Sequence, residues 1–300
     1  DEVTCYIFTA KNRSPRCPVH INVHGGGFVR PHVERDEIYS AKVADAIGGI
    51  VVDVDYKLAP EYPFPTAFQE VYEVGRWTFS QLKKWDADEK RVSMGGHSAG
   101  ANLTAAVTLK ANQTKEFQLC LQVLDYGAFD LATDPDDKKG AADNLIPAER
   151  GRMFTEAYTD GDLTLTRDPY CSPLWAPDEM LEGLPEALVV TAGYDNFRFE
   201  DYDYMESKLF SYAPKHGMRA LVEVHHGIVQ PSKAYQEGGI HEAICDYEDA
   251  IFFEILAEEL ARRDLGVYGI PEDVTPLTSR MEEYMQEFEA NGIENLSVDI

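Results

Sequence analysis

Basic residues are scarce in this chain of 300 residues. There are 27 lysines and arginines against 53 aspartates and glutamates, so the formal net charge at pH 7 is −26. A surface with this charge repels the phosphates of nucleic acids and the anionic headgroups of membranes. The composition therefore argues against nucleic-acid and membrane partners. Solubility is the simplest role for the acidic surface, and adaptation to high salt is the alternative interpretation.

The sequence also lacks long hydrophobic runs, internal repeats and paired cysteine motifs. No stretch of about eighteen apolar residues is present, so no transmembrane helix is expected. The five cysteines form no Cys-x-x-Cys pair, and their odd number favours free thiols in a reducing compartment. We therefore expect a cytoplasmic protein. With 44% hydrophobic residues, the chain can fold around a sizeable core.

Strand-like runs alternate with helical patterns along most of the chain. Strands are expected at residues 19–23, 50–55, 91–94, 119–124, 187–191 and 220–224, and helices near residues 35–47, 67–85, 99–112, 200–213 and 241–263. This alternation is typical of an α/β fold in which helices cover both faces of a mostly parallel central sheet.

Two segments interrupt the alternation. Residues 130–175 are polar, include a run of aspartates and contain a helical patch, so a small helical cap insertion over the strand ends is expected. Residues 271–300 contain an acidic amphipathic pattern, which predicts a helical extension that docks on the same chain or on a second subunit. A homo-oligomer is therefore left open. The core domain is expected at residues 1–129 and 176–270.

The most informative motif is Gly96-His97-Ser98-Ala99-Gly100, which lies between a strand pattern and a helical pattern. A nucleophile elbow needs this context, because a sharp strand-to-helix turn must expose the serine hydroxyl, and small neighbours must let other backbone approach. Ser98 is therefore the candidate nucleophile. His97 is expected to belong to the packing of the elbow, because neighbours on a turn rarely face each other.

Three glycines follow the first predicted strand, in His24-Gly25-Gly26-Gly27. Glycine leaves the backbone bare, so its N–H groups can approach a small anion closely. Acyl transfer needs such donors for the tetrahedral oxyanion, together with the N–H of the residue after the nucleophile. We assign this role to Gly26, Gly27 and Ala99. For the glycine triplet alone, an ordinary tight turn is the alternative.

Asp195 and His226 each follow a later predicted strand, at the edge where an α/β sheet presents residues to ligands. The chain order Ser98, Asp195, His226 is the one expected of a serine hydrolase with this kind of elbow. His226 would accept the Ser98 proton, and Asp195 would orient the imidazole. His225 competes as the base, since side chains alternate along a strand. Considered alone, Asp195 is also consistent with a turn former or a helix cap, and His226 with a loop histidine whose hydrogen bonds are satisfied.

Together these motifs resemble the hormone-sensitive-lipase-like family of α/β-hydrolases. The resemblance rests on residues 24–28, 55–65, 96–103, 172–174, 183–185, 195–198 and 226–227, in the family's order. It implies an α/β-hydrolase fold and a carboxylesterase for short to medium acyl chains, with no metal or organic cofactor. It also implies the triad Ser98, Asp195 and His226 and the oxyanion donors Gly26 and Gly27.

Three features depart from the family pattern. His97 stands where the family usually has Asp, as it does in kynurenine-formamidase-like relatives that hydrolyse an N-formyl amide. Phe199 replaces the second Asp of the family's Asp-x-x-Arg-Asp-Glu motif, which is expected to alter contacts around the cap and not the triad. About twenty residues precede the first matching strand, so the usual N-terminal cap is expected to be truncated, absent or replaced.

The sequence thus predicts a serine carboxylesterase for small esters of short acyl chains. Phe28, Tyr194 and Phe197 are the candidate substrate-binding residues. An amidase or arylformamidase with the same triad is the first alternative, and a non-catalytic ligand receptor is the second. No metal site is expected, because the aspartate run lacks the spacing of a calcium loop.

Overall fold

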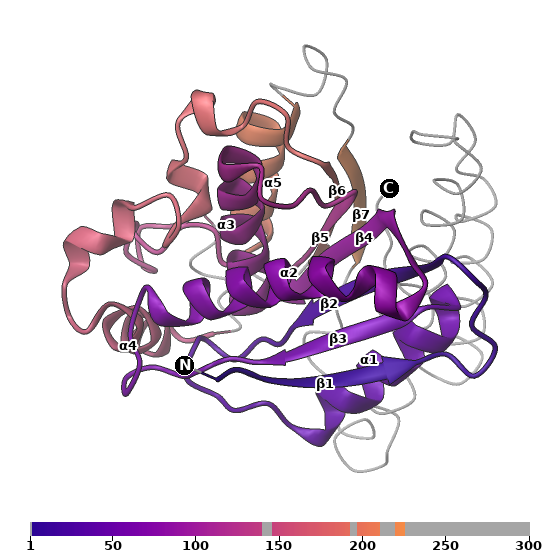
Figure 1. Ribbon diagram of the computed structural model, residues 1–300. Helices are drawn as coiled ribbons and strands as arrows, with labels where there is room; N and C mark the ends of the chain where they lie inside the picture. Colours follow the sequence, from indigo (N-terminus) through magenta and orange to yellow (C-terminus); the bar gives the residue numbers. More distant parts are fainter. Residues whose placement is uncertain (1, 140–145, 193–196, 211–219, 226–300) are drawn as a thin grey trace, which may run out of the picture.

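The computed structural model describes residues 2–139, 146–192, 197–210 and 220–225. Within these residues, one seven-stranded sheet has the order β1-β3-β2-β4-β5-β6-β7 (Figure 1). The strands are β1 (Thr4–Thr9), β2 (Cys17–Val23), β3 (Ile50–Asp55), β4 (Ala87–His97), β5 (Leu121–Asp125), β6 (Glu186–Ala192) and β7 (Ala220–His225). Neighbouring strands run parallel except β1 and β3, which are antiparallel.

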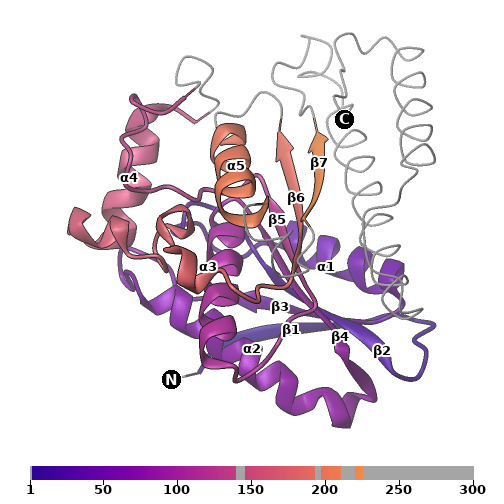
Figure 2. The ribbon, with the colours of Figure 1, turned by 90° about the horizontal axis from the view of Figure 1, so that it is seen from above.

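Helices cover both faces of the sheet. They are α1 (Glu34–Ile47), α2 (Thr66–Trp85), α3 (Ala99–Thr114), α4 (Ala148–Thr159) and α5 (Arg198–Tyr204), and α5 continues into a π-helical turn (Met205–Phe210). Figure 2 shows α2, α3 and α5 on one face and α1 on the other. All seven residues of β2 are buried, as expected of a central strand with apolar layers on both sides. The predicted α/β fold with a mostly parallel sheet is confirmed.

Strand β1 was not predicted from the sequence. It lies at the edge of the sheet, and its register pairs Thr4 with Asp55 and Thr9 with Ile50. Its apolar side chains are only partly covered, with Tyr6 36% and Ile7 43% exposed. An edge strand without a fully buried face does not show the alternating pattern that reveals a strand. The predicted helix at residues 241–263 and the extension at residues 271–300 lie outside the described residues.

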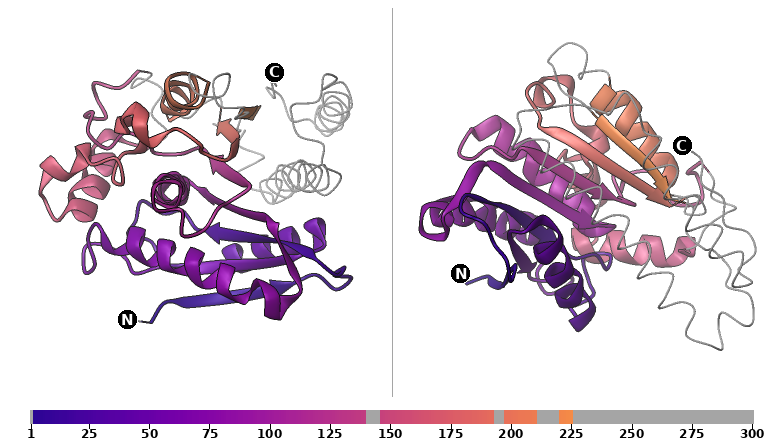
Figure 3. Two further views of the ribbon diagram at one scale, coloured as in Figure 1. Left: turned by 45° about the horizontal axis from the view of Figure 1, so that its top comes forward. Right: turned by 90° about the vertical axis from the view of Figure 1, so that its right-hand side faces the viewer.

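In its described part, the connection between β5 and β6 carries α4 and three short 3₁₀ helices (Leu163–Arg167, Pro173–Trp175 and Asp178–Met180). Figures 2 and 3 show α4 beyond the carboxyl ends of the central strands. The aspartate run before α4 is exposed, and two of its carboxylates pair with the helix. The Arg152 guanidinium donates to Asp134 at 2.7 and 2.8 Å and also pairs with Asp136. Exposed ion pairs thus connect the aspartate run to α4.

Candidate active site

Ser98 forms a one-residue turn between β4, which ends at His97, and α3, which begins at Ala99. Its backbone has φ 52° and ψ −115°, a region that residues with a side chain rarely adopt. A Cβ on Gly96 would lie 2.5 Å from the carbonyl oxygen of Val23, so only glycine lets this turn rest on β2. The geometry expected of a nucleophile elbow is present at Ser98.

The glycine loop that follows β2 lies directly against this turn. A Cβ on Gly25 would lie 2.7 Å from the carbonyl oxygen of His97. Gly26 and Gly27 have φ values of +122° and +60°, and the N–H groups of Val29 and Arg30, three and four residues after Gly26, both donate to the Gly26 carbonyl. The loop is thus a tight turn beside Ser98, and two of the predicted oxyanion donors, Gly27 and Ala99, line one pocket with Ser98.

A mostly apolar pocket opens beside Ser98. Its lining includes five residues predicted for the site: Gly27, Phe28, Ser98, Ala99 and Phe197. Helix α4 contributes Phe154, which lies so close to the loop that a Cβ on Gly27 would fall 2.6 Å from its ring. The structure therefore brings the elbow, the glycine loop and α4 together around one pocket.

Asp195, Tyr194 and His226 lie outside the described residues, and no side chain of His225 is described. The strands that lead to them are described. His97 is in register with Asp125, Asp125 with Val190, and Ala192 with His225. Parallel strands in register end at the same edge of a sheet, so β6 and β7 both run toward the edge that carries Ser98.

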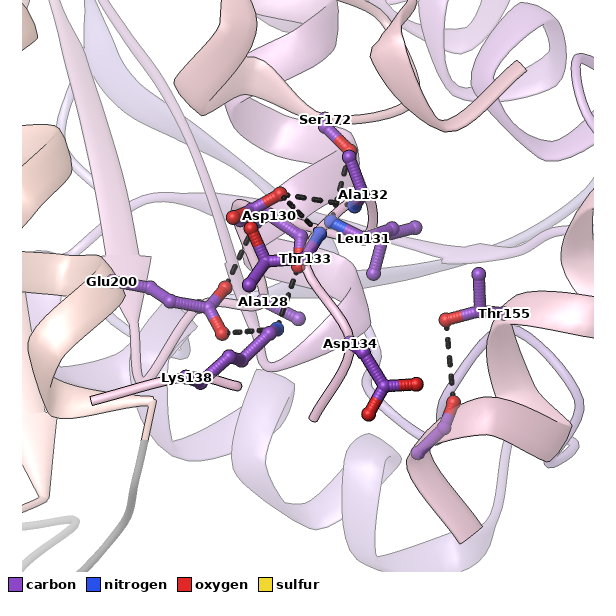
Figure 4. Close-up of polar contacts among 12 residues, drawn as sticks. Ala128, Asp130, Leu131, Ala132, Thr133, Asp134, Lys138, Thr155, Ser172 and Glu200 are labelled. Carbon is purple, nitrogen blue, oxygen red and sulfur yellow. Dashed lines mark hydrogen bonds and ion pairs between the residues drawn. The ribbon is translucent and has the colours of Figure 1, made fainter. Parts of the chain in front are cut away.

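One wall of the pocket contains a buried ion pair (Figure 4). The Lys138 ammonium donates to the Glu200 carboxylate at 2.5 Å and to the Asp130 carbonyl at 2.6 Å, and both charged side chains are less than 10% exposed. The second Glu200 oxygen accepts from the Asp130 N–H at 2.8 Å. Burial raises the pKa of Glu200, while the adjacent Lys138 lowers it. The Lys138 cation in this wall is therefore paired with a carboxylate, and the pKa of the neighbouring buried Asp130 is also lowered by its hydrogen bonds and by Lys138.

Polar side chains behind the glycine loop form a buried network that sequence reasoning missed. The Asp53 carboxylate bonds to His32 at 2.9 Å and accepts from the Asn22 amide at 3.0 Å. The bond to Asp53 raises the pKa of His32. The Tyr56 hydroxyl donates to the His24 carbonyl at 2.9 Å, and the two rings stack at 4.2 Å. The His24 and His32 rings lie 5.6 Å apart, so the network joins β2, β3 and the segment before α1 to the base of the loop.

His97 does not line the pocket. Its Nδ1 bonds to the Asp125 carboxylate at 2.6 Å, and the two side chains are 18% and 13% exposed. The sequence predicted that His97 packs within the elbow but did not identify its partner. The available signal was the polar Asp125 at the end of an apolar strand, because β4 and β5 place residues 97 and 125 in register.

No three His, Cys, Asp or Glu side chains in the described ranges are grouped so that they could hold a metal ion. None of the helices in the same ranges is both long and apolar enough to span a lipid bilayer.

Comparisons with known proteins identify relatives of this fold. A family model described as alpha/beta hydrolase fold matches residues 20–228. The arylesterase of Saccharolobus solfataricus is 30% identical over 221 residues, which cover 72% of this chain and 70% of the relative. The arylacetamide deacetylase of Oryctolagus cuniculus is 40% identical over 244 residues, which cover 61% of each chain. The chain spans 59 to 70% of the length of the curated relatives it matches.

Solved structures agree in fold. A hyperthermophilic esterase from the archaeon Pyrobaculum calidifontis superposes with a TM-score of 0.72 at 26% identity, covering 89% of this chain and 87% of the other. A structure of an arylesterase gives a TM-score of 0.67 at 26% identity, covering 86% and 81%. The similarity therefore extends over most of the sheet and its helices.

Proposed function

The chain belongs to the hormone-sensitive-lipase-like carboxylesterases of the α/β-hydrolase fold, and from this premise we propose that it hydrolyses short-chain acyl esters with Ser98 as the nucleophile. The observation that carries the proposal is the strained turn at Ser98, which opens into an apolar pocket beside a glycine loop. Strain of this kind persists only where surrounding structure holds it, and it is concentrated at functional sites.

In the proposed mechanism, Ser98 Oγ attacks the ester carbonyl carbon while His226 accepts the hydroxyl proton. The carbonyl oxygen becomes an oxyanion, which the backbone N–H groups of Gly26, Gly27 and Ala99 stabilise. The carbon–oxygen bond to the alcohol breaks, and the alcohol leaves with the proton from His226. Water then attacks the acyl-enzyme with His226 again as base, releasing the acid and restoring Ser98. Asp195 orients the imidazole throughout.

Ester hydrolysis is the direct test. We expect the full chain to release nitrophenol from p-nitrophenyl acetate and butyrate, and a fluorophosphonate to label Ser98 stoichiometrically, because only an activated serine reacts with this reagent. A folded chain that hydrolyses no short ester contradicts the proposal. An unlabelled Ser98 instead favours the non-catalytic receptor.

Helix α4 supports the proposal of short acyl chains, because its position restricts the pocket. Its Tyr158 ring stacks on Phe28 at 3.8 Å, and its Tyr158 carbonyl accepts from the Phe64 N–H at 2.7 Å. Phe154 lies on α4 between Tyr158 and Arg152, and Arg152 pairs with Asp134. These contacts position the Phe154 ring over Gly27. We propose that residues 130–175 act as a small cap and that the substrate is uncharged, since Glu200 neutralises Lys138 in the wall.

Replacing Phe154 by alanine should widen the pocket and change substrate preference. We expect the ratio of kcat/KM for an eight-carbon ester to that for a four-carbon ester to rise about tenfold, because a few methylene groups then find room. One series of esters varies the acyl group and a second varies the alcohol. Together they identify which part of the ester occupies the volume left by the Phe154 ring. Met153→Ala is the matched control, since Met153 is the preceding residue and is 51% exposed. An unchanged ratio in Phe154→Ala contradicts the restriction.

An amidase or arylformamidase with the same triad is the second candidate. It is favoured by the 40% identity to arylacetamide deacetylase and by His97 in the elbow. Because His97 bonds to Asp125 and does not line the pocket, it makes no described contact that selects an amide. Comparing kcat/KM for N-formyl-kynurenine with that for matched esters decides between the two. A preference for the esters rejects the formamidase.

A further inference from the structure

Asp125 contacts the elbow twice. Its backbone carbonyl accepts the N–H of Ser98 at 2.9 Å, and its carboxylate bonds to Nδ1 of His97 at 2.6 Å. A single residue of β5 therefore holds two consecutive residues of the strained turn. The Ser98 bond comes one step beyond the last pair of the β4–β5 ladder, His97 with Asp125.

The pair is enclosed on the α1 face of the sheet. The Tyr39 ring of α1 packs edge-on against the His97 ring at 4.6 Å between centroids, and the Tyr126 ring lies 5.9 Å away. Both members of the pair are less than 20% exposed. A hydrogen bond between a carboxylate and an imidazole in such surroundings is stronger than the same contact in water.

Hydrogen bonds also connect this region to β6, the next strand of the sheet. The N–H of Tyr126, the residue after Asp125, donates to the Val190 carbonyl of β6 at 2.7 Å. Tyr126 itself has a φ of +37°. A row of bonds thus runs from Ser98 through residues 125 and 126 to β6, the strand that leads to Asp195. Displacing Asp125 would shift the nucleophile relative to that strand.

We infer that His97 and Asp125 act as positioning residues that hold Ser98 in register with β5 and β6. This inference rests on the proposed function, because it concerns the orientation of the same nucleophile. The imidazole does not transfer a proton from substrate. Its role is to fix the Asp125 carboxylate, and through it the carbonyl that holds the Ser98 N–H. A displacement of about 1 Å at a reacting atom can reduce the rate about 100-fold.

The test compares Asp125→Asn, His97→Gln and the exchange variant that combines His97→Asp with Asp125→His. Asp125→Asn retains the backbone carbonyl and the side-chain volume, so it isolates the carboxylate. We expect each single variant to lower kcat and the rate of fluorophosphonate labelling by about 10- to 100-fold, with KM nearly unchanged. The exchange variant restores a carboxylate–imidazole pair across the same register and should recover most of the loss.

Asp88→Asn is the matched control. Asp88 lies near the other end of β4, is 7% exposed and pairs with Arg16 at 2.5 Å. It should leave the labelling rate unchanged, although it removes an ion pair from the same strand. Melting temperatures measured in parallel show how much each variant destabilises the fold.

Four results would each overturn the inference: single variants that label at the wild-type rate, an exchange variant no faster than the single variants, a loss matched by Asp88→Asn, or an effect on KM alone. If the wild-type chain is not labelled, the proposed function fails. If the wild type is labelled and the variants match it, only the positioning role fails.

Discussion

The variant Ser98→Ala is expected to lose ester hydrolysis by about 10⁴-fold or more in kcat while remaining folded. The serine oxygen is the atom that attacks the carbonyl carbon, and no acyl-enzyme forms without it. Alanine retains the Cβ, so the turn with φ 52° meets no new steric demand. The measurement is the initial rate with p-nitrophenyl butyrate, together with the melting temperature of the variant.

Two comparisons sharpen this result. Ser80→Ala, at an exposed position of α2, should retain the wild-type rate. His226→Ala should lose about as much activity as Ser98→Ala, because nucleophile and base act as a unit, whereas His225→Ala should lose far less. If His225→Ala is the inactive variant, His225 is the base. A Ser98→Ala variant with near wild-type activity removes the proposed mechanism altogether.

The arrangement of the fold could be predicted because short stretches of sequence are enough to indicate each strand and helix. The alternation of apolar strands and helical patterns extends along the chain, and each stretch carries its own periodicity. The elbow is equally local, since Gly96, Ser98 and Gly100 lie within five residues. Strand β1 escaped prediction because it gains its place only by pairing with β3 at the edge of the sheet.

The contacts that fix the site could not be predicted in the same way. His97 and Asp125 are 28 residues apart, and Lys138 and Glu200 are 62 apart. Each pair forms only because particular strands or loops become neighbours in the fold. The sequence around a polar residue does not indicate which distant residue it will pair with. Once the sheet order is known, the register of β4 with β5 makes the first pair evident. Topology therefore supplies what periodicity cannot.

The position of α4 illustrates the same point for the pocket. The sequence predicted a helical patch within a cap, but not which of its side chains would meet the glycine loop. In the structure, Phe154 lines the pocket, whereas Tyr158 is fully buried against Phe28. The two residues are four apart and share one face of the helix, so only the docking of α4 separates their roles.

Gly100→Ala is expected to destabilise the fold by about 3 kcal/mol or more and to abolish activity, although alanine favours helices over glycine by about 1 kcal/mol. Gly100 lies in the first turn of α3. A Cβ there would lie 2.0 Å from the Val23 carbonyl oxygen and 2.7 Å from that of His24. Both are backbone atoms and have no alternative rotamer, so α3 must move away from β2.

The control is Gly48→Ala, at the C-cap of α1, where φ is +61° and no atom lies within 4 Å of an added Cβ. That change meets only backbone strain, which costs about 1–2 kcal/mol, and activity should persist. Urea unfolding gives both free energies, and equal stability of Gly100→Ala and wild type contradicts the steric argument. The close approach at Gly100 is what brings the start of α3, and with it the N–H of Ala99, to the glycine loop. Glycine has a lower helix propensity than alanine, but it is required at position 100 because the backbone of α3 there contacts the end of β2.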